Sequence, residues 1–259
     1  MTHIVLIHGM SGTPKGWDNF KGVLEARGFT VHAPALRHHD MLPDAAPPRG
    51  LATTSLLDYA ADLEAYIDKL PEKPVIMGHS MGGLLALMLA ARNRATCAVL
   101  LTPAAPAGVN ALTWSVLRVG WRTLVTWGFW RKPVMPHYAE ARWGVFNRVD
   151  EAEARRLFAD MVPDSGRAVF EIGIAALDRR KASHVDPAAI RCPLLVVGAA
   201  EDRMTPASVI RRIGARYPTA NYVELAGHGH WVLGEPGWES IATRCIDWIE
   251  VRQTTARTR

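Results

Sequence analysis

The chain has 259 residues, of which 49% are hydrophobic and 21% are charged, and its formal net charge is +5. This length suits one large α/β domain or a core with one insertion, and the composition is that of an ordinary globular enzyme. No uncharged apolar run is long enough to span a membrane, no Gly-rich phosphate loop occurs, and no Cys/His cluster has the spacing of a zinc site.

The N-terminal third predicts strands that alternate with helices. Apolar runs at 4–7 and 29–33 predict two strands, and a helix that begins at Pro14 and ends at Gly28 connects them. A second helix, capped by one of residues 53–55, then presents apolar side chains along one face. This alternation favours a parallel sheet.

The start of the chain and its cysteines bear on the cellular compartment. The first residues already form a predicted strand and lack the basic start, apolar stretch and cleavage site of a signal peptide. Cys97, Cys192 and Cys245 are odd in number and widely spaced, which favours reduced thiols over disulfides. We therefore expect a cytoplasmic protein.

The most informative stretch is a short apolar run at 75–77 that ends in Gly78-His79-Ser80-Met81-Gly82 and continues into an apolar helical run. This pattern predicts a strand, a tight turn and a helix, with Ser80 at the apex of the turn. The strand and the helix approach so closely that only glycine fits at positions 78 and 82. We therefore predict that Ser80 is a nucleophile and that the Met81 N–H group points to the site where an oxyanion would form.

After a fourth strand at 97–101, the pattern changes between 103 and 187. Strand-like runs disappear, and helical periodicity appears with five tryptophans within thirty residues: Trp114, Trp121, Trp127, Trp130 and Trp143. We interpret 107–187 as a helical cap in which most tryptophans form a core and one or two line an apolar pocket facing Ser80.

Charge is unevenly distributed and is concentrated in the predicted cap. Residues 107–191 contain thirteen Lys/Arg and nine Asp/Glu, a balance of +4 that leaves +1 for the rest of the chain. Such a bias could attract anionic substrates, but a solvated helical surface is the favoured interpretation. No run interleaves basic and aromatic residues on one face, so nucleic acid is not expected as a partner.

The strand–helix alternation resumes after the cap. The predicted elements are strands at 193–197 and 221–225 and helices at 206–217 and 238–251. Residues 1–106 and 188–252 thus form the core, and the polar residues 253–259 are expected to be disordered. Six strands alternating with helices predict a doubly wound, essentially all-parallel six-stranded sheet, with the helical cap inserted after the fourth strand.

A serine nucleophile needs a base and a carboxylate, which in a parallel sheet come from loops at the carboxyl ends of strands. Asp202 follows the strand at 193–197 and is favoured as the acid over its neighbour Glu201; the alternative is that Asp202 only caps a helix. His228 and His230 both follow the last strand and are both candidates for the base.

These residues together resemble the α/β-hydrolase superfamily. The matching motifs are Gly78-His79-Ser80-Met81-Gly82, His8-Gly9, Asp202-Arg203-Met204-Thr205-Pro206 and Gly229-His230-Trp231. Ser80, Asp202 and His230 follow the family's order of nucleophile, acid and base. In the family a glutamate commonly stands five residues after the catalytic histidine, as Glu235 does after His230, and this favours His230 over His228. The resemblance also implies a family member that lacks two leading antiparallel strands.

The resemblance further implies an activity. It places the oxyanion hole at the backbone N–H groups of Met10 and Met81 and implies a serine carboxylesterase that acts through an acyl-enzyme without cofactor or metal. The tryptophan-rich cap predicts a small-molecule ester with an apolar moiety. The alternatives are a thioesterase, a lactonase, a carbon–carbon bond hydrolase or an acyltransferase, and, from another class, a non-catalytic ligand receptor.

Overall fold

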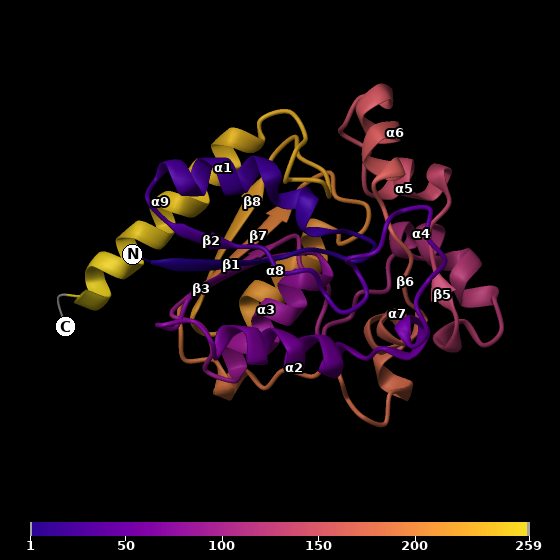
Figure 1. Ribbon diagram of the computed structural model, residues 1–259, viewed down its shortest axis with the longest axis horizontal. Coiled ribbons are helices and arrows are strands. Elements are labelled where there is room, and N and C mark those ends of the chain that lie inside the picture. Colours follow the sequence, from indigo (N-terminus) through magenta and orange to yellow (C-terminus); the bar gives the residue numbers. More distant parts are fainter. Residues whose placement is uncertain (1, 258–259) are drawn as a thin grey trace.

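The structure is a computed structural model that describes residues 2–257. Its centre is a six-stranded sheet whose strands are all parallel and stand in the order β2-β1-β3-β4-β7-β8 (Figure 1). The strands are β1 His3–Ile7, β2 Thr30–His32, β3 Val75–His79, β4 Ala98–Leu101, β7 Leu194–Ala199 and β8 Ala220–Leu225. The predicted sheet is thereby confirmed.

Helices cover both faces of this sheet (Figure 1). One face packs on η1 Pro14–Trp17, α1 Asp18–Ala26 and α9 Trp238–Arg257, and the other on α2 Leu56–Ile67, α3 Met81–Ala91 and α8 Ala207–Arg216. The short helix η2 Leu51–Thr53 precedes α2 and contacts the insertion between β4 and β7. Successive side chains of a strand point to opposite faces, so Leu6 enters one core and Val5 the other. Both strand faces are therefore apolar, as the continuous run at 4–7 predicts.

The C-terminal helix is longer than the sequence pattern indicates. Helix α9 continues to Arg257, so the expectation of a disordered tail is wrong for 253–257, and 258–259 lie outside the described residues. No Gly or Pro follows Gly237, so the sequence after this residue offers none of the usual signals that end a helix. None of the helices within residues 2–257 is both long and apolar enough to cross a bilayer.

The chain between β4 and β7 forms the insertion, seen beside the sheet in Figure 1. Its elements are α4 Trp114–Val125, η3 Phe129–Arg131, β5 Pro133–Val134, α5 Tyr138–Gly144, α6 Glu151–Ala159, β6 Asp164–Ser165, α7 Gly166–Gly173, η4 Ala175–Leu177 and η5 Pro187–Ala189. The antiparallel pair β5–β6 departs from the expected all-helical cap. Two-residue strands are too short to leave a periodic pattern in the sequence.

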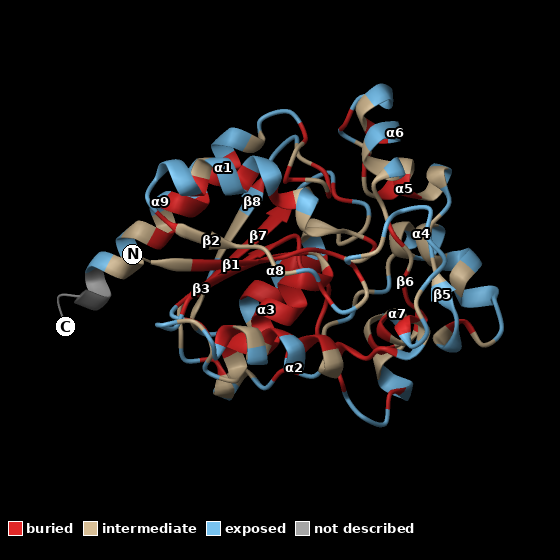
Figure 2. Cartoon of the chain, viewed as in Figure 1, coloured by how far each residue is buried: buried red, intermediate tan, exposed pale blue. Residues whose placement is uncertain are grey.

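The tryptophans of the insertion do not form its core, which corrects the sequence-based expectation. Trp114, Trp121 and Trp127 are 77%, 51% and 85% exposed, and Figure 2 shows α4 with no buried residue. The small core of the insertion is built by Ala141, Phe146, Val149 and Ala154. Helical spacing reveals that α4 has an apolar face, but not whether the protein covers that face.

A buried glutamate attaches α7 of the insertion to the core. Glu171 is 0% exposed and accepts hydrogen bonds from the Ser55 hydroxyl at 2.8 Å and the Leu56 N–H group at 2.8 Å. These donors lie at the start of α2, where a carboxylate also interacts favourably with the helix dipole. Arg167 Nε lies 2.7 Å from the same carboxylate and compensates its charge. The second half of the insertion is thus joined to the core by a charged, hydrogen-bonded contact.

Candidate active site

The site lies where the strand order reverses. Strands β1 and β3 are neighbours in the sheet. From β1 the chain continues toward one edge, to β2, and from β3 it continues toward the other edge, to β4. Ligands of open α/β folds bind at such a point. The loop after β1 and the turn after β3 meet here. A Cβ atom added to Gly9 would lie 3.0 Å from the Ser80 Cβ atom, so the two segments are in contact.

Ser80 is held at the apex of a strained turn between β3 and α3. Its φ of 54° and ψ of −119° are unfavourable for a residue with a side chain. A Cβ atom on Gly78 would lie 2.1 Å from the Gly82 carbonyl oxygen, and one on Gly82 would lie 2.1 Å from the Ile7 carbonyl oxygen. The predicted lack of space for a side chain at positions 78 and 82 is therefore confirmed.

The structure brings Asp202 and His230 together. Asp202 Oδ2 accepts a hydrogen bond from His230 Nδ1 at 2.9 Å, and the two residues are 5% and 2% exposed. Asp202 Oδ1 accepts from the N–H groups of Met204 at 2.7 Å and Thr205 at 2.8 Å. The carboxylate is thus fixed by the start of the loop before α8 and orients the His230 ring.

Thr205 is a residue that the sequence analysis did not single out. Its hydroxyl lies 2.8 Å from Asp202 Oδ2, 3.0 Å from the Thr102 carbonyl oxygen and 3.3 Å from His230 Nδ1. The position is three residues after Asp202 in the Asp202-Arg203-Met204-Thr205-Pro206 motif, which is the only signal that the sequence gives. The side chain supports the carboxylate that holds His230.

The second histidine has a different partner. His228 Nδ1 lies 2.9 Å from Glu235 Oε1, and Glu235 also accepts the Gly229 N–H group at 2.9 Å and 3.0 Å. Burial raises the pKa of Glu235, opposed by these hydrogen bonds and by the neighbouring histidine. Glu235 therefore fixes the loop that carries both histidines and binds His228, which leaves His230 to pair with Asp202.

His79, the residue before Ser80, packs against His230. It is 3% exposed, and its Nε2 atom donates to the His230 carbonyl oxygen at 2.8 Å. Burial, with the nearby His230, lowers the pKa of His79 to about 3, so the ring is neutral and its single proton sits on Nε2. His79 thus holds the backbone of His230.

Ser80 and His230 line one cavity of about 290 Å³. Within the part of the chain that the structure describes, the Ser80 hydroxyl makes no hydrogen bond. Catalytic hydrogen bonds are often long in ligand-free proteins and tighten when substrate binds. The side chain therefore faces the cavity with its oxygen available.

Two backbone N–H groups, those of Met10 after β1 and Met81 after Ser80, have no partner among the described residues. Ser11, next to Met10, has a φ of 57°, donates its N–H group to Asp164 Oδ2 at 2.7 Å and accepts from the Val162 N–H group at 3.1 Å. The insertion thus fixes the backbone beside Met10.

Asp164 belongs to a buried ion pair that the sequence analysis missed. His39 Nε2 lies 3.1 Å from Asp164 Oδ2 and His39 Nδ1 lies 3.0 Å from the Arg37 carbonyl oxygen, with both side chains of the pair 0% exposed. Two acceptors require a proton on each ring nitrogen, so the ring is an imidazolium. The Tyr59 hydroxyl donates a further hydrogen bond to the Asp164 carboxylate, at Oδ1, over 3.2 Å.

The pKa values agree with that charge assignment. Burial alone would lower the pKa of His39, but the Asp164 carboxylate and the hydrogen bonds outweigh it and raise the pKa. Burial alone would raise the pKa of Asp164, but His39 and the N–H groups of Ser11 and Ser165 outweigh it and lower the pKa.

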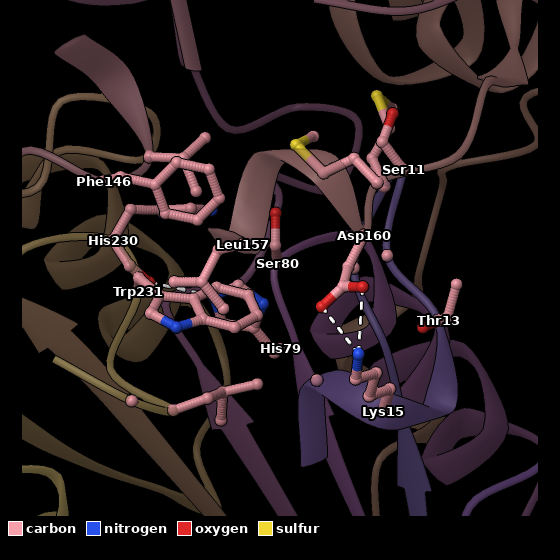
Figure 3. Close-up of a pocket in the computed structure, with 18 of the residues that line it drawn as sticks. Ser11, Thr13, Lys15, His79, Ser80, Phe146, Leu157, Asp160, His230 and Trp231 are labelled. Atoms are coloured by element: carbon pink, nitrogen blue, oxygen red, sulfur yellow. Dashed lines mark hydrogen bonds and ion pairs between the residues drawn. The ribbon is translucent and has the colours of Figure 1, made fainter. Parts of the chain in front are cut away.

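The cavity has an apolar wall and a charged rim (Figure 3). The apolar side chains are Met10, Val145, Phe146, Leu157, Met161, Met204, Trp231 and Leu233. At the rim, Lys15 pairs with Asp160 at 2.9 Å, and Arg156 pairs with Glu153. In Figure 3 the Ser80 side chain lies between the aromatic residues and the Lys15–Asp160 pair. The rim cations are thus paired with carboxylates.

The tryptophan of this cavity is Trp231, which follows His230, and none of the five tryptophans of the insertion lines it. The expectation that one or two of those five would face Ser80 is therefore wrong. Instead, residues after α5 and along α6 supply the wall from the insertion. Among residues 2–257, no group of three His, Cys, Asp or Glu side chains is arranged to hold a metal ion.

Known proteins are similar to this chain. A pyrethroid hydrolase from Sphingobium wenxiniae is 32% identical over 85 residues, which cover 32% of this chain and only 28% of that protein. A putative carbamate hydrolase, RutD, from Escherichia coli O139:H28 is 26% identical over 231 residues, which cover 88% of this chain and 84% of that protein. The crystal structure of a methylesterase from Arabidopsis shares the fold, with a TM-score of 0.72 and 15% identity over 97% of this chain and 100% of that chain.

The family model described as the alpha/beta hydrolase family matches residues 4–238. This range extends from β1 to the first residue of α9 and includes the Ser80 turn, Asp202 and His230. It covers far more than half of the sequence, and the chain therefore belongs to the alpha/beta hydrolase family.

Proposed function

We propose that this protein is a serine carboxylesterase in which Ser80, His230 and Asp202 act together. The observation that carries the proposal is the buried hydrogen bond of 2.9 Å between His230 Nδ1 and Asp202, next to the strained Ser80 turn. Because the ring proton is on Nδ1, where it is donated to the carboxylate, Nε2 of the neutral ring carries none and can accept the serine proton. The hydrolase relatives are consistent with this chemistry.

In the acylation half of the reaction, His230 Nε2 takes the Ser80 proton while Ser80 Oγ bonds to the ester carbonyl carbon. The negative charge that develops on the carbonyl oxygen is stabilised by the N–H groups of Met10 and Met81, each worth about 3 kcal/mol in the transition state. The tetrahedral intermediate then collapses, the alkoxide leaves, and His230 gives it the proton. Asp202 remains a carboxylate and stabilises the imidazolium.

In the second half, water replaces the alcohol and His230 takes a proton from it. The resulting hydroxide bonds to the acyl carbon, and collapse of this second intermediate returns the proton to Ser80 and releases the carboxylic acid. Each step uses only the chain's own groups and water.

The cavity supports a preference for an apolar moiety. Phe146, Leu157 and Trp231 offer apolar surface near Ser80, whereas the rim cations Lys15 and Arg156 are already paired with carboxylates. A hydrophobic acyl or alcohol group gains from burial against this wall. The excess positive charge of the insertion lies outside the cavity and gives no reason to expect an anionic substrate.

A fluorophosphonate probe tests the proposal. We expect the probe to label the wild-type protein at Ser80, located by mass spectrometry of the peptides, and we expect Ser80→Ala to lose both labelling and turnover of p-nitrophenyl esters. A panel of such esters with increasing acyl length then identifies the preferred acyl group. A wild-type protein that folds but neither labels nor hydrolyses any ester would instead be a receptor, and the proposal would be wrong.

Replacing Thr205 by valine should lower kcat about tenfold with little change in KM, because one hydrogen bond to a buried carboxylate is lost. Thr205→Ser retains the hydroxyl and is the matched control, which should restore most of the rate. Steady-state kinetics on one p-nitrophenyl ester measures both constants. An equal loss of rate in the serine variant would show that packing of the methyl group matters more than the hydrogen bond.

A further inference from the structure

The exposed apolar side chains of the described residues are concentrated in one segment. Of the eleven large hydrophobic side chains that are exposed, eight fall between 112 and 135: Leu112, Trp114, Leu117, Trp121, Leu124, Val125, Trp127 and Met135. Exposed apolar residues scattered singly are ordinary, but a contiguous group of this kind marks an interaction surface. These eight residues are called the α4 surface below.

Spacing along the helix puts most of these side chains on one face of α4. Trp114, Leu117, Trp121, Leu124 and Val125 recur every three or four residues and therefore point in one direction. The opposite side packs inward, where Val119 Cγ2 lies 2.8 Å from the place of a Cβ atom on Gly144. The apolar face of α4 is thus the one that faces solvent.

The same segment is basic and contains no acidic residue. Residues 107–139 contain four Lys/Arg, namely Arg118, Arg122, Arg131 and Lys132, and no Asp or Glu. The Arg122 guanidinium lies 5.3 Å from the centre of the Trp121 ring, and Lys132 Nζ donates to the Trp127 carbonyl oxygen at 3.1 Å. Cationic groups therefore lie directly beside exposed tryptophans.

We propose that the α4 surface docks this protein onto an anionic lipid bilayer, as a peripheral contact with α4 lying in the plane of the interface. Tryptophan suits the boundary between headgroups and acyl chains because its ring is apolar and its N–H group is polar. Lys and Arg attract anionic headgroups, and the absence of carboxylates from 107–139 removes repulsion. The neighbouring carboxylate of Glu140 lies 3.3 Å from Arg122 Nε, and its side chain is only 13% exposed. Exposed aromatic and aliphatic side chains with flanking cations therefore complement such a membrane in both polarity and charge.

This surface is separate from the catalytic cavity. None of its eight residues lines the cavity that contains Ser80. The proposal therefore does not depend on the carboxylesterase assignment, and the two fail independently in experiments.

Co-sedimentation of the full chain with sucrose-loaded vesicles tests the docking. Vesicles of phosphatidylcholine alone are compared with vesicles that contain about one quarter phosphatidylglycerol. We expect binding to the anionic vesicles, and a partition coefficient reduced at least about tenfold in the triple variant W114A/W121A/W127A. The double variant R131Q/K132Q should bind about tenfold more weakly, and added salt should reduce wild-type binding in the same direction.

Matched controls are available elsewhere on the surface. L42S/L177S removes two exposed apolar side chains and R179Q/R180Q removes two exposed cations outside the α4 surface, and both should bind as the wild type does. Quenching of tryptophan fluorescence by brominated lipids should occur in the wild type and be reduced in the triple variant. Circular dichroism and turnover of a short soluble ester report whether each variant is folded.

Three outcomes would overturn the proposal. The first is no vesicle binding by the folded wild type, and the second is unchanged binding of the triple tryptophan variant. The third is a wild-type dimer, detected by light scattering, that dissociates in the triple variant while no vesicle binding occurs; a second copy of the chain would then be the occupant of the α4 surface. Equal binding to neutral and anionic vesicles would contradict the role given to the cations.

Discussion

His230→Ala is expected to lower kcat/KM for a p-nitrophenyl ester by about 10⁴-fold or more, because Ser80 would lose the group that accepts its proton. His228→Ala is the matched control two residues away on the same loop. His228 pairs with Glu235 and does not line the cavity that contains Ser80. Its replacement should change the rate by less than about tenfold, since Glu235 still holds the Gly229 N–H group.

The two variants separate a chemical role from a structural one. Equilibrium unfolding of each variant in urea shows whether it is folded under the assay conditions, and loss of rate in folded His230→Ala then reflects catalysis. The assignment of His230 as the base is wrong if His228→Ala alone abolishes turnover.

Asp164→Asn is expected to lower the free energy of unfolding by about 3–5 kcal/mol, the typical result of breaking one member of a buried ion pair. The substitution leaves the protonated His39 ring without its counterion, and both side chains of the pair are 0% exposed. It also replaces the acceptor of the Ser11 N–H group and of the Tyr59 hydroxyl. Equilibrium unfolding in urea measures the change.

The difference between wild type and Asp164→Asn should depend on pH in a defined direction. The folded pKa of His39 lies above its ordinary 6.5, so its contribution is complete below that value and is lost as pH rises through the raised pKa. The folded pKa of Asp164 lies below its ordinary 3.8, so its contribution is complete above that value and is lost as pH falls through the lowered pKa. We expect the free-energy difference at roughly pH 6 to exceed that at roughly pH 9.

Asp160→Asn is the control for this effect. Asp160 is also in the insertion and pairs with Lys15 at 2.9 Å, but its side chain is 34% exposed and that of Lys15 is 58% exposed. An exposed pair contributes at most about 1 kcal/mol. Equal destabilisation by the two substitutions, or a difference that does not change with pH, would contradict the assignment of a charged His39–Asp164 pair.

The parts of the site that the sequence predicts are those encoded locally. The turn around Ser80 is fixed by two glycines within five residues, and their steric reason can be given without coordinates. The positions of Asp202 and His230 follow from strand order, since parallel strands bring their carboxyl ends to one edge. The preference for His230 over His228 comes from the family spacing of Glu235, five residues after His230, and it stays a prediction; that Glu235 contacts the His228 ring at 2.9 Å cannot be foreseen from that spacing.

Other features have no local signal. His39 and Asp164 are 125 residues apart, and one of them lies in a loop, so neither periodicity nor a motif connects them. The apolar spacing of α4 predicts a helix, but a pattern of this kind does not state whether protein or solvent meets the apolar face. Charge pairing at the cavity rim likewise depends on which surfaces the fold brings together, as with Lys15 and Asp160.

The buried attachment of α7 has a consequence for how such a protein acquires new specificities. Substitutions near Asp164 and Glu171 disturb contacts between the insertion and the core, so most of them would be eliminated for loss of folding before any change in selectivity mattered. The side chains of Val145 and Leu157 border the cavity and make no such hydrogen-bonded contact with the core. Laboratory evolution toward other substrates should therefore accumulate its accepted changes at positions such as Val145 and Leu157 and leave Asp164 and Glu171 unaltered.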